Sequence, residues 1–294
     1  MLNPTYLASK NEHPRDKQVK FEEIGHKYTV DGDDSFMSVT TWNHSHFEEF
    51  NANAAINCMK KGRKWNNSHE MFGKTNDEIK QIWKNNGTES SKAGTKMHFD
   101  IECFYNNIKP KNESIEFKYF LNFNKKIKNM EAYRTEMIVW DKNLKLCGSI
   151  DMIYEHDDGR ISIYDWKRCK KIKTEGFRGK TSKTEAISHL PDSNFWHYSL
   201  QLNTYKYLIE KNYNKVVKGM YLICLHPNNE NNNYLKYKVP ILKEEMKSLM
   251  NLRLQMVQKE NKLKSCDWCY TNKDVIIYNK NSYGEKSLCK KCFK

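Results

Sequence analysis

Residues 148–172 constrain the fold of this chain more than any other stretch. They read GSIDMIYEHDDGRISIYDWKRCKKI, two apolar runs on either side of an acidic turn. Alternating apolar residues around such a turn predict two paired strands. Each run nevertheless contains an aspartate where an apolar residue is expected, and a lysine follows the second aspartate two positions later. A buried, unpaired carboxylate is costly, so these charges need each other or a cation.

The predicted strand faces bring the charged residues together. In a strand over residues 161–167, Asp165 and Lys167 share one face with two core isoleucines. A three-residue loop ending at Gly159 places Asp151 opposite Asp165, whereas a two-residue loop turns Asp151 away. Glycine suits the last loop position, which needs a positive φ. We therefore expect the two carboxylates to converge.

Converging carboxylates indicate a site for a hard divalent cation. Oxygen ligands suit Mg²⁺ or Mn²⁺. Such a cation lowers the pKa of a bound water and neutralises charge that develops on a phosphate. Lys167 would orient the attacking water or stabilise the pentavalent transition state, so the set suits phosphodiester hydrolysis. From these residues alone, the alternative is a surface ion pair of Asp165 and Lys167 at a strand end.

Three further acidic or imidazole residues need an explanation. Residues 85–94 are expected to form a loop, and a helix is expected to begin near Thr95. That helix places His98 and Glu102 one turn apart. Glu136 lies inside an apolar predicted strand, TEMIVW, where a carboxylate again needs a partner.

A later predicted helix carries a polar stripe. Gln201 and Tyr205 lie four residues apart in HYSLQLNTYKY and therefore share one helix face. His197 extends the stripe one turn back. Taken singly, these residues are ordinary at helical spacing.

Together the motifs resemble the PD-(D/E)XK nuclease superfamily, in particular its RecB-type exonuclease branch. That branch includes CRISPR-adaptation nucleases, a mitochondrial genome-maintenance exonuclease and, more distantly, lambda exonuclease. Its pattern is G-T-x-x-H-x-x-x-E, G-x-x-D, [DE]-x-K and Q-x-x-x-Y, in that order. The matching residues are Gly94, Thr95, His98, Glu102, Gly148, Asp151, Asp165, Lys167, Gln201 and Tyr205. Order and spacing agree across roughly residues 90–210.

The resemblance implies a restriction-endonuclease-like α/β fold, a mixed sheet flanked by helices. It implies that the catalytic Mg²⁺ or Mn²⁺ is bound by His98, Asp151, Asp165 and the Trp166 carbonyl. Lys167 would be the catalytic lysine, and Gln201 and Tyr205 would position the DNA backbone or the site's side chains. Glu136 resembles the extra upstream acid of some members.

Charge indicates a polyanionic partner. The 294-residue chain has a formal net charge of +14, which favours nucleic acid, although a Lys/Asn-rich composition also fits an AT-rich genome. A polar loop that follows the predicted catalytic strand concentrates the charge. We expect its cations to bind DNA phosphates, the alternative being a solvated loop. They are Arg168, Lys170, Lys171, Lys173, Arg178 and Lys180.

The tail predicts a separate structural metal. Cys266 and Cys269 form one C-x₂-C pair, and Cys289 and Cys292 form another. Two such pairs predict one tetrahedral Zn²⁺ that folds a small zinc ribbon. We therefore divide the chain into a nuclease domain, residues 1–262, and a ribbon, residues 263–294. Some RecB-type nucleases hold an iron–sulfur cluster with one upstream and three C-terminal cysteines, and the paired spacing departs from that pattern. The basic ribbon suits DNA contact or a protein partner equally.

These features predict a metal-dependent deoxyribonuclease, an exonuclease acting at DNA ends in repair, recombination or genome processing. The alternatives are a structure-selective or site-specific endonuclease, a non-catalytic DNA-binding or scaffold module with a nuclease fold, and an RNA-processing nuclease. The first residues lack an apolar signal core, and no apolar run is long enough to span a membrane. We expect an intracellular protein of the nucleus, the cytoplasm or a viral replication site.

Overall fold

The structure is a computed structural model that describes residues 4–22, 25, 27–263, 275–279 and 285–289, with side chains up to residue 261. The helices are α1 (Tyr6–Lys10), α2 (Val39–His44), α3 (Ala52–Lys60), α4 (Asn76–Tyr105), α5 (Ile115–Asn124), α6 (Asn194–Asn212) and α7 (Lys243–Leu263). Short 3-10 turns are η1 (Pro14–Gln18), η2 (Phe177–Gly179) and η3 (Glu185–Ile187). The strands are β1 (Val19–Glu22), β2 (Lys27–Val30), β3 (Met37–Ser38), β4 (Met130–Asp141), β5 (Leu146–His156), β6 (Ile161–Lys167), β7 (Val217–Cys224), β8 (Leu235–Lys238), β9 (Val275–Asn279) and β10 (Glu285–Cys289).

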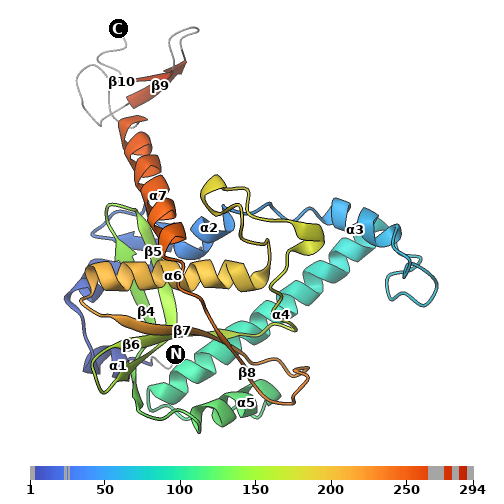
Figure 1. The fold of residues 1–294 in the computed structure, drawn as a ribbon, viewed down its shortest axis with the longest axis horizontal. Helices are drawn as coiled ribbons and strands as arrows, with labels where there is room; N and C mark the ends of the chain where they lie inside the picture. Colours follow the sequence, from blue (N-terminus) through green and yellow to red (C-terminus); the bar gives the residue numbers. More distant parts are fainter. Residues whose placement is uncertain (1–3, 23–24, 26, 264–274, 280–284, 290–294) are drawn as a thin grey trace.

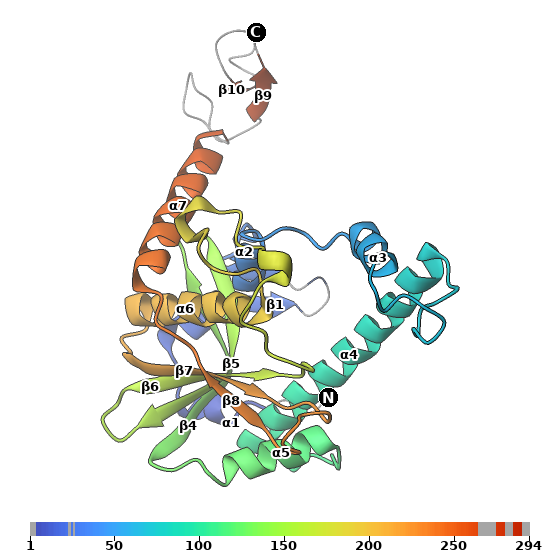
Figure 2. The ribbon, with the colours of Figure 1, turned by 45° about the vertical axis from the view of Figure 1, so that its right-hand side comes forward.

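A mixed six-stranded sheet forms the centre of the fold. Its order is β3-β5-β6-β7-β8, and β4 pairs with the other edge of β5. The β4–β5, β5–β6 and β7–β8 pairs are antiparallel, whereas β3–β5 and β6–β7 are parallel. Helices cover both faces (Figures 1 and 2), so the expected α/β class with a mixed sheet is confirmed.

The two faces of the sheet bury different cores. On one face, residues of α2, α6 and α7, such as Trp42, Leu208 and Leu249, pack with Ile161 and Ile163 of β6. On the other face, α4 and α5 pack on Tyr154, Tyr164 and Trp166. Alternate residues of β6 therefore enter opposite cores, which explains why every position of the strand except the last is buried. Only the end of β6 reaches a polar environment.

The β5–β6 turn confirms the predicted register. Glu155 pairs with Ile161, and His156 N–H donates a hydrogen bond to Arg160 O, which leaves a three-residue loop. Gly159 closes this loop with φ +75°, a conformation that L side chains avoid. The same register, extended along both strands, places position 151 opposite position 165.

One edge of β5 is divided between two strands. Along this edge β6 pairs with residues 152–155, whereas β3 pairs only with Leu146 and Cys147. Residues 148–151 have no partner on this edge among the described strands. The sheet therefore opens in the middle of β5, at the position of Asp151.

Helix α4 corrects the sequence analysis. The loop predicted over residues 85–94 is wrong, because the helix continues unbroken from Asn76 to Tyr105. Thr75 and Glu78 form a capping box at its start, which satisfies free N–H groups of the first turn. Thr95 therefore lies in the helix interior and does not begin a helix.

The continuity of α4 follows from anchoring at both ends. Near its start, Ile79 packs with Ile56 and Met71, while Ile101 packs against the sheet. Residues 84–92 between these anchors are all exposed. Once a helix is nucleated, adding a residue costs little, and an interior glycine costs only about 1 kcal/mol. Two packed ends therefore outweigh the poor local propensity of the middle.

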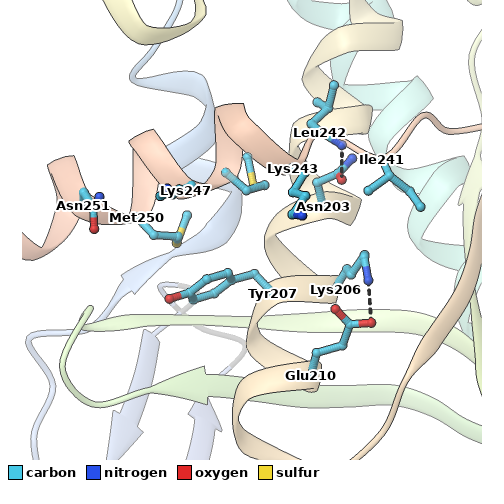
Figure 3. A pocket seen from close by; sticks show the side chains of 11 residues that line it. Asn203, Lys206, Tyr207, Glu210, Ile241, Leu242, Lys243, Lys247, Met250 and Asn251 are labelled. Atoms are coloured by element: carbon cyan, nitrogen blue, oxygen red, sulfur yellow. Dashed lines mark hydrogen bonds and ion pairs between the residues drawn. The ribbon is translucent and has the colours of Figure 1, made fainter.

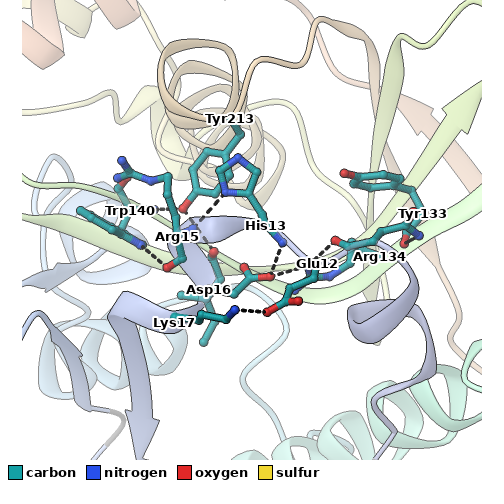
Figure 4. Close-up of polar contacts among 11 residues, drawn as sticks. Glu12, His13, Arg15, Asp16, Lys17, Tyr133, Arg134, Trp140 and Tyr213 are labelled. Atoms are coloured by element: carbon teal, nitrogen blue, oxygen red, sulfur yellow. Dashed lines mark hydrogen bonds and ion pairs between the residues drawn. The ribbon is translucent and has the colours of Figure 1, made fainter.

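The N-terminal segment clamps β4 from outside (Figure 4). The Arg15 guanidinium lies 3.5 Å from the ring centroid of Trp140, and Nη2 donates to Trp140 O at 2.8 Å. Arg134 Nη1 forms an ion pair with Asp16 Oδ2 at 2.8 Å. Tyr213, after α6, accepts a hydrogen bond from Trp140 N–H. These contacts stiffen the strand that carries Glu136.

The predicted zinc site lies outside the described residues. Cys266, Cys269 and Cys292 fall in undescribed segments, and Cys289 ends β10, where only the backbone is described. β9 and β10 form an antiparallel pair. The zinc ribbon and the division between residues 262 and 263 both stay predictions. Among the described residues, no helix has the length and apolarity needed to cross a membrane.

Candidate active site

The opening in the sheet positions Asp151. The β5–β6 pairing ends at Met152 and Tyr164. Just beyond it, the Trp166 N–H donates a hydrogen bond to the side chain of β5, to Asp151 Oδ2 at 2.9 Å. A side chain thus replaces a backbone partner at the point where the strands separate. The Asp151 side chain is only 13% exposed, so its carboxylate is held in a low-dielectric environment.

Strand β4 brings a second carboxylate opposite the first. Thr135 pairs with Met152 and Met137 with Ile150, so Glu136 lies across from Asp151. Glu136 has φ 44°, a left-handed conformation that costs a non-glycine residue about 1–3 kcal/mol. Its Oε2 accepts a hydrogen bond from Ser149 Oγ at 2.7 Å. The strain marks a backbone that is bent in order to place this side chain.

Helix α4 adds an imidazole. His98 Nδ1 lies 3.4 Å from Asp151 Oδ2, and the Trp166 backbone is hydrogen-bonded with the same ring. One ligand atom each of His98, Glu136 and Asp151 lies within 4.8 Å of the other two. Three separate elements, α4, β4 and β5, therefore bring their polar side chains to one place.

Without a cation, this cluster is electrostatically unfavourable. Burial and the neighbouring Asp165 raise the pKa of Asp151 to about 8. Burial and Asp151 likewise raise the pKa of Glu136, whereas burial lowers the pKa of His98. All three shifts disfavour the charged form of the group, which is the pattern expected of buried ligand groups that lie close together.

The donor set fits the cation that the sequence predicted. Two carboxylates and one imidazole suit Mn²⁺, and the carboxylate oxygens suit Mg²⁺. The set differs in one respect from the expectation. Glu136, expected only as an extra acid, lies in the three-residue group with His98 and Asp151, whereas Asp165 does not.

Asp165 instead forms an ion pair with the predicted catalytic lysine. Its Oδ2 lies 2.7 Å from Lys167 Nζ, with side-chain exposures of 4% and 17%. Burial by itself lowers the pKa of Lys167, but Asp165 and Asp151 outweigh burial and raise it above its usual value. Lys167 Nζ also lies 4.5 Å from the ring centroid of Tyr198 on α6. Lys167 therefore stays protonated and is held in one position.

Helix α6 links two of the sequence motifs directly. Gln201 Nε2 donates a hydrogen bond to the Tyr205 hydroxyl at 3.1 Å. A Cβ on Gly148 would lie 2.9 Å from Tyr205 Cε1 and 3.2 Å from the Tyr205 hydroxyl. Gly148 is therefore needed so that the tyrosine can pack against the open part of β5. His197, expected to extend this stripe, is bonded to Asp192 instead.

A family comparison agrees with this geometry. A family model described as the PD-(D/E)XK nuclease superfamily matches residues 44–273. The chain belongs to the PD-(D/E)XK nuclease superfamily. Among solved structures, one titled "Crystal structure of SSO0001" has 13% sequence identity and a TM-score of 0.34, covering 89% of this chain and 88% of its own. No curated protein matches the chain.

Tyr198 and Tyr28 of this PD-(D/E)XK core were not found from the sequence, whereas Glu102 was part of the predicted helix motif. Tyr198 lies three residues before Gln201, and helical spacing in the stripe would have identified it. Burial and Glu136 raise the pKa of Glu102 to about 7, so this residue belongs to the same electrostatic cluster. Tyr28 of β2 is hydrogen-bonded with the Ser149 backbone and interacts with Glu136. No local pattern connects Tyr28 to the motifs.

The basic loop begins beside the site. Lys167 O accepts a hydrogen bond from Leu225 N–H, so the loop leaves the sheet where β7 also ends. Arg168 is held by Glu116, with Nε 2.7 Å from Oε1. The other five predicted DNA-binding cations of the loop are exposed. A cavity of about 330 Å³ lies between the loop and the middle of α4, lined by Asn86, Glu89, Ser90, Arg168, Lys170, His226, Pro227 and Asn228.

A larger groove lies elsewhere. It has a volume of about 410 Å³ and lies between α6 and α7 (Figure 3). Its lining includes Tyr207 of α6, Ile241 of the segment just before α7, and Met250 of α7. None of the residues of the four motifs lines it, so the chemistry of the nuclease core does not take place there.

Glycine-to-alanine substitutions test the packing of the motifs. Gly148→Ala should lower the free energy of unfolding by about 1–3 kcal/mol, because the new methyl overlaps Tyr205. Gly94→Ala is the matched control. It lies inside α4 with nothing within 4 Å of the added Cβ, so it should raise stability by about 0.5–1 kcal/mol. Urea unfolding measures both. A destabilising Gly94→Ala would contradict a continuous α4.

Metal binding should depend on pH. Because the pKa of Asp151 is raised to about 8 without metal, a cation must displace a proton at lower pH. The Kd for Mn²⁺ should rise about tenfold per pH unit from pH 8 to pH 6, for one proton released. Calorimetry in buffers of different ionisation enthalpy measures the affinity and the proton count. Asp151→Asn is the control and should lose the binding. A Kd that is constant over this range contradicts the assignment of Asp151 as a ligand.

Proposed function

We propose that this chain is a metal-dependent deoxyribonuclease of the RecB type that hydrolyses phosphodiester bonds at DNA ends. One observation carries the proposal. His98, Glu136 and Asp151 converge within 4.8 Å, and Asp165, whose charge also raises the pKa of Asp151, is paired with Lys167. A non-catalytic binding module has no need of this complete set, and the carboxylates raise the cost of burying one another.

The roles of the residues follow from their environments. His98, Glu136 and Asp151 would hold the cation, with Asp165 and the Trp166 carbonyl as the further ligands implied by the family resemblance. When bound, the cation supplies an activated water and offsets charge on the phosphate. Lys167, protonated and fixed by Asp165 and Tyr198, would donate hydrogen bonds to the attacking water or to the phosphate oxygens.

The proposed action at ends and the choice of DNA as substrate rest on the sequence motifs and on the exposed cations of the basic loop. The Q-x-x-x-Y and histidine-helix motifs resemble the exonuclease branch, which supports action at ends and a 5′-phosphate product. The exposed cations of residues 170–180 support a DNA backbone as substrate. Repair, recombination and genome processing are the roles that such an enzyme serves.

Cleavage of labelled DNA tests the proposal. With Mg²⁺ or Mn²⁺, the protein should degrade end-labelled linear DNA from its ends and leave a closed circle intact. Asp165→Ala and Lys167→Ala should each lower the rate about 100-fold or more, because each removes a preorganised charge from the site. Gly87→Ala, which lies in α4 outside the motifs with nothing within 4 Å of the added Cβ, serves as a folded control with unchanged activity.

The other outcomes separate the alternatives. Cutting of the closed circle would identify an endonuclease. A wild-type protein that cuts neither substrate, yet binds DNA as tightly as both variants, would show a binding module and end the catalytic proposal. Degradation of RNA alone would redirect the proposal to RNA processing.

We also propose one structural Zn²⁺ held by the two cysteine pairs of the tail, supported by their spacing alone. Elemental analysis of the purified chain should give about one zinc per molecule, and Cys266→Ser with Cys292→Ser should remove it. Iron with a visible absorption band in place of zinc would show a cluster instead.

A further inference from the structure

A helical arm stands away from the sheet. It comprises residues 50–83, that is, α3, the first turns of α4 and the segment between them (Figures 1 and 2). The arm has a small core of its own, in which Ile56, Met71 and Ile79 are buried. The exposed stretch of α4 over residues 84–92 leads from it to the nuclease core. A structure with its own core can present a surface without support from the sheet.

The surface of the arm is basic. Residues 50–74 contain five lysines or arginines and one acidic residue, Glu70. Lys61, Arg63 and Lys64 are exposed, and none of the three forms an ion pair with a residue that the structure describes. Three adjacent cations without counter-charges favour a polyanion.

Aromatic rings are exposed on the same arm. Phe50 is 75% exposed and lies 6.0 Å from Trp83, centroid to centroid. Phe72 is 45% exposed and lies 5.7 Å from Trp65. A single exposed apolar residue needs no explanation, whereas apolar rings that gather in pairs on one small unit are typical of a binding surface. The two ring pairs offer flat faces to which bases can stack.

Internal contacts hold this surface in place. Lys60 Nζ donates a hydrogen bond to Asn76 Oδ1 at 2.7 Å and lies 5.7 Å from the Trp65 ring centroid. Trp65 N–H donates to Gly62 O, and the Trp65 ring packs 5.0 Å from His69. The segment between the helices is therefore ordered by its own contacts, so little conformational entropy is lost when it binds a ligand.

We propose that the arm binds single-stranded DNA. Unpaired cations next to exposed rings match the way single strands are held, by phosphate contacts and base stacking without base-specific hydrogen bonds. A surface for an apolar protein partner would have few charged residues at its centre, and this one has a run of them. The inference rests on the proposed function only in taking DNA as the substrate.

The arm and the metal cluster lie on one rigid element. Trp83 and His98 are fifteen residues apart in α4, or about 22 Å at 1.5 Å per residue. A stacked strand rises about 3.4 Å per nucleotide, so about six or seven nucleotides separate the arm from the cut. The arm would hold the strand at that distance while the nuclease core acts on it.

Binding of a labelled dT20 oligonucleotide tests the inference, measured by anisotropy in EDTA so that no cleavage occurs. Phe50→Ala with Phe72→Ala should raise the Kd about tenfold, from lost stacking. Lys61→Ala with Arg63→Ala and Lys64→Ala should also reduce the slope of log K against log salt by about 2. The matched control changes Lys109, Lys111 and Lys118, exposed cations beside α5, to alanine and should change neither value.

Three outcomes would overturn the inference. If the arm variants bind dT20 with the same Kd as the wild type, the arm has no binding role. If the control variant loses as much affinity as the lysine and arginine variant of the arm, only the net charge of the protein matters. If the phenylalanine variant also binds a blunt 20-base-pair duplex more weakly than the wild type, and by the same factor as dT20, the rings do not stack on the bases of a single strand. Phe50→Ala alone keeps the test valid if the double variant unfolds, because Phe50 contributes little to the arm core. Arm-dependent binding without cleavage in Mg²⁺ would end the proposed nuclease function and leave the arm assignment standing.

Discussion

Repulsion among buried carboxylates at one opening in the sheet is the constraint on which the structure depends. Asp151 and Glu136 lie across from each other on β5 and β4, and the charge of Asp165 on β6 also raises the pKa of both. In a low-dielectric site their charges raise one another's pKa. Such an arrangement destabilises the metal-free fold and is tolerable only when a cation is bound or a lysine neutralises part of the charge.

The surrounding architecture fits this requirement. The edge of β5 is left unpaired over residues 148–151, which opens space for side chains. Glu136 adopts a strained backbone conformation in the middle of a strand, and the N-terminal clamp around Trp140 stiffens that strand. Gly148 lets Tyr205 pack against the same opening. The strained and charged residues at the opening destabilise the fold, and the two apolar cores on either side of the sheet offset this cost.

The prediction from sequence worked where one local rule decided the outcome. The turn ending at Gly159 set the β5–β6 register, because the last position of a three-residue loop favours a glycine of positive φ. It failed where distant contacts decided. Residues 85–94 have the composition of a loop, yet they are helical because α4 is packed at both of its ends. Glu136 was expected as an accessory acid, and its place among the ligand atoms followed from β4–β5 pairing that no local pattern reveals.

The sequence by itself determined which residues carry chemistry and which face of each strand or helix they occupy, because side-chain periodicity is a property of the local backbone. It determined the α/β class for the same reason. Only the tertiary structure decided that His98, Glu136 and Asp151 meet, that Lys167 is paired with Asp165 beside Tyr198, and that the basic aromatic segment before α4 stands apart as an arm. These are contacts between elements far apart in the chain, and the packing of both cores against one sheet sets them.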